Sequence, residues 1–104
     1  VPAYAQSLMQ LHGTNNWKNV LANTKTMMEQ LADKPVLNDA ILSTIKHPVL
    51  IGVGDRDNTA TVAENLHAQL QLPNSALLVL PNTPHPFDKV NFEMLVLFCK
   101  NFFN

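Results

Sequence analysis

Residues 48–57 read Pro48-Val49-Leu50-Ile51-Gly52-Val53-Gly54-Asp55-Arg56-Asp57, an apolar run that ends in acidic residues. The run at 49–53 is too short for a helix and rich in β-branched residues, which is typical of a strand buried on both faces of a parallel sheet. A second run of the same kind spans residues 76–80. The sequence therefore predicts an α/β fold built around two neighbouring parallel strands.

A helix is predicted between these two strands. Thr61-Val62-Ala63-Glu64 has the pattern of a capping box, in which the threonine and glutamate side chains each accept a backbone N–H at the start of a helix. Val62, Leu66 and Leu70 then recur at helical spacing. Strand, helix and strand in this order form one right-handed βαβ unit.

Helical patterns also flank this unit, over residues 4–11, 17–31, 38–45 and 89–103. The last of these has only a narrow polar stripe, which predicts burial on more than one side. We expect a single partial domain over residues 1–104, with a helical segment at 1–46 and a βαβα unit at 47–104.

The predicted sheet is incomplete. Two parallel strands are too few for a stable layer, because a parallel sheet needs cover on both faces and an isolated pair has open edges. Further strands come either from residues outside this sequence or from another copy, and the start at Val1-Pro2 without methionine agrees with a piece of a longer chain. For the chain by itself we expect a homo-oligomer that pairs through the exposed sheet edge.

The composition argues against several classes of partner. The net charge is −1 and the seven basic residues are scattered, so no nucleic-acid partner is expected. The apolar segment 92–103 is too short to span a bilayer and is interrupted by Glu93 and Lys100, so no membrane association is expected.

The single cysteine, Cys99, excludes an intrachain disulfide, and no secretory signal precedes the fold, so we expect a cytoplasmic protein.

The C-terminal half of the sequence carries an ordered set of motifs. It has Ile45 to Asp57 with the turn Gly54-Asp55-Arg56-Asp57, a helix, the run Leu77 to His85, and a long terminal helix. This order resembles the C-terminal part of α/β-hydrolase-fold enzymes, in which a Gly-x-x-Asp turn after the penultimate strand bears the triad acid. In those enzymes, the loop after the last strand bears the triad histidine. The resemblance implies that Asp57 is the acid, that Asp55 is a turn residue and that His85 is the histidine, in the family's order Ser, Asp, His.

The resemblance also implies an enzyme whose nucleophile lies elsewhere, because the chain has no Gly-x-Ser-x-Gly turn. The full-length parent is expected to hydrolyse an ester or related bond of a small-molecule substrate, with Asp57 orienting His85 and His85 moving protons, and without a cofactor or metal. The isolated chain is expected to be inactive. The sequence departs from the family at Pro84, where glycine is common, and at Asn58-Thr59-Ala60, where proline is common.

Two alternatives remain open. The stretch Asp55-Arg56-Asp57-Asn58-Thr59 also resembles the Asp-x-Asp-x-Thr signature of haloacid-dehalogenase-type phosphatases, in which Asp55 would attack phosphorus, Asp57 would act as acid and base, and Mg²⁺ would screen charge. That signature normally opens a long domain. The second alternative is a non-catalytic interaction module, in which the two aspartates cap helix amides and His85 is an exposed loop residue. The other histidines, His12, His47 and His67, show no ligand spacing and are expected to be structural or surface residues.

Overall fold

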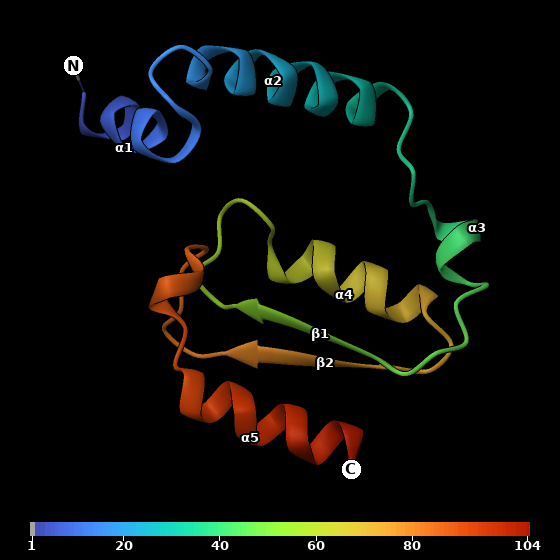
Figure 1. The fold of residues 1–104 in the computed structure, drawn as a ribbon. Helices are drawn as coiled ribbons and strands as arrows, with labels where there is room; N and C mark the ends of the chain where they lie inside the picture. Colours follow the sequence, from blue (N-terminus) through green and yellow to red (C-terminus); the bar gives the residue numbers. More distant parts are fainter. Residues whose placement is uncertain (1) are drawn as a thin grey trace. The chain divides into compact units, whose positions relative to one another are not determined.

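The first part of the chain is a pair of helices. A computed structural model describes residues 2–104, which divide into two compact units, the first ending at Val36 and the second spanning Leu37–Asn104. In the first unit, α1 (Ala3–His12) and α2 (Trp17–Asp33) contact each other (Figure 1). Both helices were predicted, and α1 ends at His12, before Gly13, whose φ of 89° favours glycine.

The second unit contains the parallel sheet. Its elements are α3 (Asp39–Leu42), β1 (Val49–Gly54), α4 (Val62–Gln71), β2 (Ser75–Leu80), the 3₁₀ turn η1 (Phe87–Lys89) and α5 (Phe92–Phe103). β1 and β2 pair in parallel, from Val49 opposite Ser75 to Gly54 opposite Leu80. The predicted α/β class is therefore confirmed. α3 belongs to this second unit.

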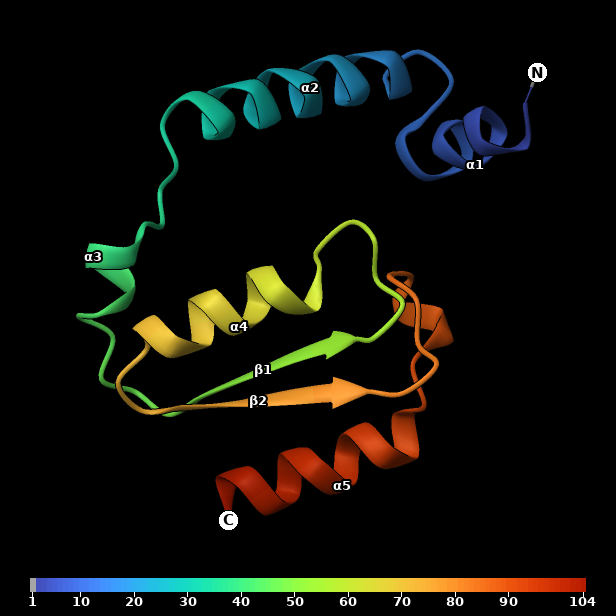
Figure 2. The same ribbon diagram turned by 180° about the vertical axis from the view of Figure 1, so that it is seen from behind.

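Helix α4 begins at the predicted capping box. The N–H of Glu64 donates to the Thr61 hydroxyl at 3.2 Å, and the Thr61 N–H donates to the Glu64 carboxylate at 3.0 Å. α4 packs on both strands, and Figures 1 and 2 show it on one face of the sheet with α5 on the other. Over residues 2–104, the buried apolar residues are Val53, Leu72 and Leu80.

The C-terminal helix differs from the prediction in two ways. It begins at Phe92 and not near Lys89, because the Asn91 side chain accepts the N–H of Met94 and the preceding Phe87–Lys89 segment forms a separate 3₁₀ turn. The prediction of burial on more than one side is wrong for this chain, since Leu97 and Phe103 are each 65% exposed. A two-stranded sheet is too narrow to cover more of the helix.

The strand β1 has an open edge. Among residues 2–104, β1 pairs with β2 and with no other strand. The N–H of Val49 donates to the Asn74 carbonyl and that of Asp55 to the Leu80 carbonyl, both at 3.0 Å. Because alternate residues of a strand bond to the same neighbour, the backbone groups of Gly52 point to the opposite edge. This edge is available for a further strand.

Candidate functional site

The two strands end at the same edge of the sheet and there bring two loops together. Parallel strands place their carboxyl ends side by side, which is where α/β proteins commonly bind ligands. The loop after β1 and the loop after β2 are joined by backbone hydrogen bonds from Asp55 N–H to the Leu80 carbonyl at 3.0 Å and from Arg56 N–H to the Thr83 carbonyl at 3.1 Å. The site is built on these two loops.

Gly54 permits the close approach of the loops. A Cβ atom at this position would overlap the backbone carbonyl of Thr83, so any side chain here would push the loops apart. Thr83 itself is only 5% exposed, and its hydroxyl donates to the Pro81 carbonyl at 2.9 Å. The glycine of the Gly-x-x-Asp turn is therefore required by the neighbouring loop.

Asp55 fastens the second loop to the first. Its Oδ1 accepts the N–H of Thr83 at 3.1 Å, and Asn82, just before, has the left-handed φ of 54° that asparagine tolerates. The backbone N–H groups of Asn82 and Thr83 at the carboxylate lower the pKa of Asp55 below its ordinary value. Asp55 is thus an ionised anchor between the two loops at neutral pH.

Asp57 has both carboxylate oxygens engaged. Its Oδ1 accepts the N–H groups of Thr59 and Ala60, each at 2.9 Å, and its Oδ2 lies 2.8 Å from Nδ1 of His85. The Ala60 N–H is the main cause that lowers the pKa of Asp57, with further lowering from His85 and Thr59 against the opposing effect of lost hydration. The side chain is only 9% exposed, so the carboxylate is held in one orientation.

His85 is held in one tautomer by this arrangement. An ionised carboxylate can only accept hydrogen bonds, so Nδ1 carries the proton that lies on Asp57. In the neutral ring, Nε2 is then an unprotonated base. The His85 side chain is 56% exposed, and within residues 2–104 its ring makes no hydrogen bond other than the one to Asp57. The pair therefore presents an available base next to a fixed carboxylate.

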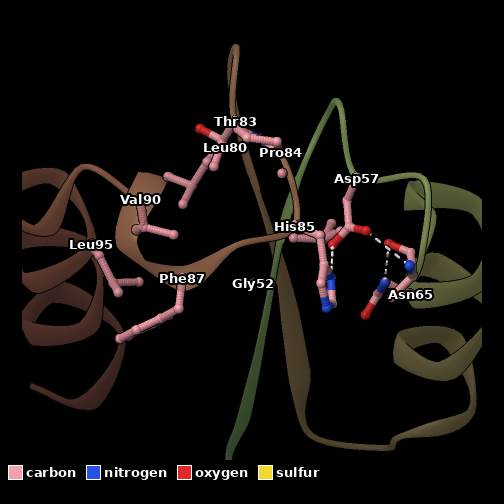
Figure 3. A pocket seen from close by; sticks show the side chains of 13 residues that line it. Gly52, Asp57, Asn65, Leu80, Thr83, Pro84, His85, Phe87, Val90 and Leu95 are labelled. Atoms are coloured by element: carbon pink, nitrogen blue, oxygen red, sulfur yellow. Dashed lines mark hydrogen bonds and ion pairs between the residues drawn. The ribbon is translucent and has the colours of Figure 1, made fainter. Parts of the chain in front are cut away.

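A pocket of about 250 Å³ lies beside this pair (Figure 3). Asp57 and His85 lie on one side of it, and apolar side chains lie on the other; the latter are Phe87, Val90 and Leu95. The Gly52 backbone crosses the floor between them (Figure 3). A small molecule with an apolar group could thus reach the available ring nitrogen of His85.

The aspartates and histidines singled out in the sequence fall into two groups. Asp57 and His85 come together, whereas Asp55 turns to the backbone of the neighbouring loop. Within the described part of the chain, no three side chains of His, Cys, Asp or Glu gather in a way that could hold a metal ion. The phosphatase alternative needs Asp55 as a nucleophile aimed at substrate, and its engagement with Thr83 disfavours that role.

Sequence reasoning missed several residues of this region. It did not single out Asn82 or Thr83. A threonine that follows a strand has no sequence feature that reveals its burial. It also did not foresee that His67, on α4, bonds through Nε2 to both carboxylate oxygens of Asp39 on α3 at 2.9 and 3.0 Å. That pair is more than half exposed and lies outside the residues that line the pocket.

No known protein family and no curated protein sequence matches the chain. Over residues 2–104, no helix has the length and apolar character needed to cross a membrane. The site's function therefore has to be inferred from its geometry.

The ionised Asp57 is expected to make stability depend on pH. Its folded-state pKa lies below the ordinary value of 3.8, so its contribution to the free energy of unfolding is complete above about pH 3.8 and is lost as the pH falls through the folded-state pKa. Asp57→Asn should lower stability at pH 7, and its difference from the wild type should shrink toward pH 2. Urea unfolding at several pH values measures this. Asp88→Asn, at a side chain 76% exposed, serves as control and should keep the wild-type profile. An Asp57→Asn difference that stays constant down to pH 2 would refute the linkage.

Proposed function

We propose that this chain is the C-terminal part of an α/β-hydrolase-fold enzyme, in which Asp57 and His85 are the acid and the histidine of a Ser-His-Asp triad. The observation that carries this proposal is the 2.8 Å contact between Asp57 Oδ2 and His85 Nδ1 at the carboxyl ends of two parallel strands. The chain order, acid before histidine, agrees with that of the family. The Gly54-x-x-Asp57 turn adds further support, because Gly54 is required there for a steric reason.

In the proposed reaction, His85 Nε2 takes the proton of a serine hydroxyl as its oxygen attacks the carbonyl carbon of an ester. The histidine then gives this proton to the leaving alcohol oxygen as the C–O bond breaks. Water, activated in the same way, releases the acid and regenerates the serine. Asp57 remains ionised throughout and stabilises the imidazolium that forms on His85.

The nucleophile and the oxyanion hole would come from polypeptide outside these 104 residues, since the sequence has no Gly-x-Ser-x-Gly turn. The substrate class proposed is a small-molecule ester or a related bond. The apolar side chains of Phe87, Val90 and Leu95, across the pocket from His85, support an apolar acyl or alkyl group in the substrate.

The proposal is tested by comparing two proteins on a short activated ester such as p-nitrophenyl acetate. The 104-residue chain should hydrolyse it no faster than its own His85→Ala variant, because it lacks the nucleophile. The protein encoded by the whole open reading frame that contains this segment should turn the ester over and lose that activity on His85→Ala. Robust turnover by the 104-residue chain, abolished by His85→Ala, would contradict the claim that the nucleophile lies outside it.

We also infer that the open edge of β1 pairs with a second copy when the chain is studied alone. An unpaired apolar strand edge is a template for another strand, and in a solution of the purified chain the available partner is the chain itself. The exposed face of α5, with Leu97 and Phe103 each 65% exposed, adds apolar surface to bury.

Gly52 offers a matched pair of variants for the edge. A Cβ at Gly52 meets no atom within 4 Å, so alanine fits there, and proline is tolerated in a strand where the N–H that it lacks faces an open edge. Gly52→Pro removes an N–H that points to the open edge, whereas Gly52→Ala keeps it. We expect light scattering during gel filtration at micromolar concentration to show a dimer or larger species for the wild type and Gly52→Ala, and a monomer for Gly52→Pro. A well-folded wild-type monomer at every concentration would exclude pairing through this edge.

A further inference from the structure

The loop that carries His85 is clamped to the loop that carries Asp57 at one buried residue, Thr83. The Thr83 N–H donates to Asp55 Oδ1 at 3.1 Å, and the Thr83 carbonyl accepts the N–H of Arg56 at 3.1 Å. Both polar groups of the Thr83 backbone are thus bonded to the first loop. Because Thr83 is only 5% exposed, water does not readily replace these bonds.

The clamp lies close in sequence to the catalytic pair on both loops. Asp55 stands two residues before Asp57, and Thr83 stands two residues before His85, so the Thr83–Asp55 bond and the His85–Asp57 bond each join residues 28 apart. Pro84 is the one residue between Thr83 and His85, and its ring fixes its φ angle. The backbone between Thr83 and His85 is therefore restricted, so a displacement of Thr83 also displaces His85.

We propose that Asp55 is a positioning residue for His85, whose carboxylate acts through Thr83 to keep His85 Nδ1 on Asp57 Oδ2. The proposal deepens the proposed function and rests on it for its catalytic meaning. Asp55 makes no hydrogen bond to the His85 ring and is not among the residues that line the pocket, so it acts by fixing the geometry of the loop. From the sequence, Asp55 was expected to be only a turn residue. In this proposal its carboxylate also aligns His85 with Asp57.

The orientation of His85 can be read without any activity. Two-dimensional ¹H–¹⁵N spectra of the histidine rings in the full 104-residue chain report which nitrogen carries the proton. A ring proton held in a short hydrogen bond to a carboxylate also gives a low-field signal that exchanges slowly with water. The wild type should show His85 as the Nδ1–H tautomer. His67 is the internal reference, because its Nε2 faces the Asp39 carboxylate and should carry the proton instead.

Three variants distinguish loss of the Thr83–Asp55 contact from a general effect on the fold. Asp55→Ala removes the acceptor of the Thr83 N–H, so the low-field Nδ1–H signal of His85 should be lost while the His67 signals stay unchanged. Asp39→Ala removes an aspartate that pairs with the other histidine, so it should change His67 and leave His85 as in the wild type. Asp55→Asn keeps one oxygen acceptor and should retain more of the His85 signal than Asp55→Ala.

A folded Asp55→Ala variant with the wild-type His85 tautomer and exchange rate would overturn the proposal. If Asp55→Ala does not fold, Asp55→Asn decides. Its neutral amide oxygen accepts the Thr83 N–H more weakly than a carboxylate does, so the His85 Nδ1–H should exchange with water faster than in the wild type. An exchange rate equal to that of the wild type in Asp55→Asn would then overturn the proposal. The outcome is independent of catalysis. Loss of the His85 signal on Asp55→Ala, together with no esterase activity in the protein from the whole reading frame, would contradict the proposed function alone. Esterase activity of that longer protein, together with an unaffected His85 in Asp55→Ala, would contradict the positioning role alone.

Discussion

Gly54→Ala is expected to be among the most destabilising single substitutions in the second unit. The added Cβ would overlap the carbonyl oxygen of Thr83, which is backbone and cannot rotate away. Forcing one extra carbon into such a contact costs about 2 kcal/mol or more. The same displacement would separate the loops, so the hydrogen bond between Asp57 and His85 should be lost as well. Urea unfolding measures the first effect, and the low-field Nδ1–H signal of His85 measures the second.

Gly52→Ala is the matched control for this prediction. It adds the same methyl group to the same strand, two residues earlier, at a position where the new Cβ meets no atom within 4 Å. Alanine also costs less backbone entropy than glycine in a strand, so the free energy of unfolding should stay the same or rise slightly. Equal stability of the two variants would show that the loops do not approach each other as closely as the structure has them.

Asp57→Asn is expected to lower activity strongly in the protein encoded by the whole reading frame. An asparagine amide can donate to His85 Nδ1, which moves the ring proton to Nε2 and removes the base. A change of this kind lowers kcat by about 10⁴-fold in a Ser-His-Asp triad. Steady-state hydrolysis of p-nitrophenyl acetate measures it, with the fold checked by the amide spectrum.

Asp88→Asn is the control for that experiment. Asp88 lies on the same stretch of chain three residues after His85, is 76% exposed and faces Lys89 at 3.9 Å. Its substitution removes one carboxylate near the site without touching the ring, so kcat should be unchanged. If Asp57→Asn retained wild-type kcat, Asp57 would not be the triad acid.

Local patterns predicted most of the fold of the second unit. The β-branched run before Asp55 and its later counterpart became β1 and β2, and the Thr61 capping box began α4 where expected. These features depend on neighbouring residues in the sequence, so they can be read from it. The contact between Asp57 and His85 agrees with the roles that the resemblance implied, and it is possible because parallel strands end at one edge of a sheet.

The features that escaped prediction depend on contacts between segments distant in sequence. The overlap that Gly54 avoids involves Thr83, and the role of Asp55 depends on the same loop. Neither follows from the local sequence, in which Asp55 reads as a turn residue. The exposure of α5 was missed for a related reason, since its apolar pattern indicates how much surface it needs to bury and not what is present to cover it.

The central claim is that Asp57 and His85 serve a serine nucleophile supplied from outside this segment. The most direct measurement is reaction of the protein from the whole reading frame with a fluorophosphonate, followed by mass spectrometry of its peptides. The account predicts one adduct per chain, on a serine outside residues 1–104 within a Gly-x-Ser-x-Gly turn, formed far more slowly in the His85→Ala variant. An adduct that forms equally fast in His85→Ala, or no adduct in an active wild-type protein, would contradict it.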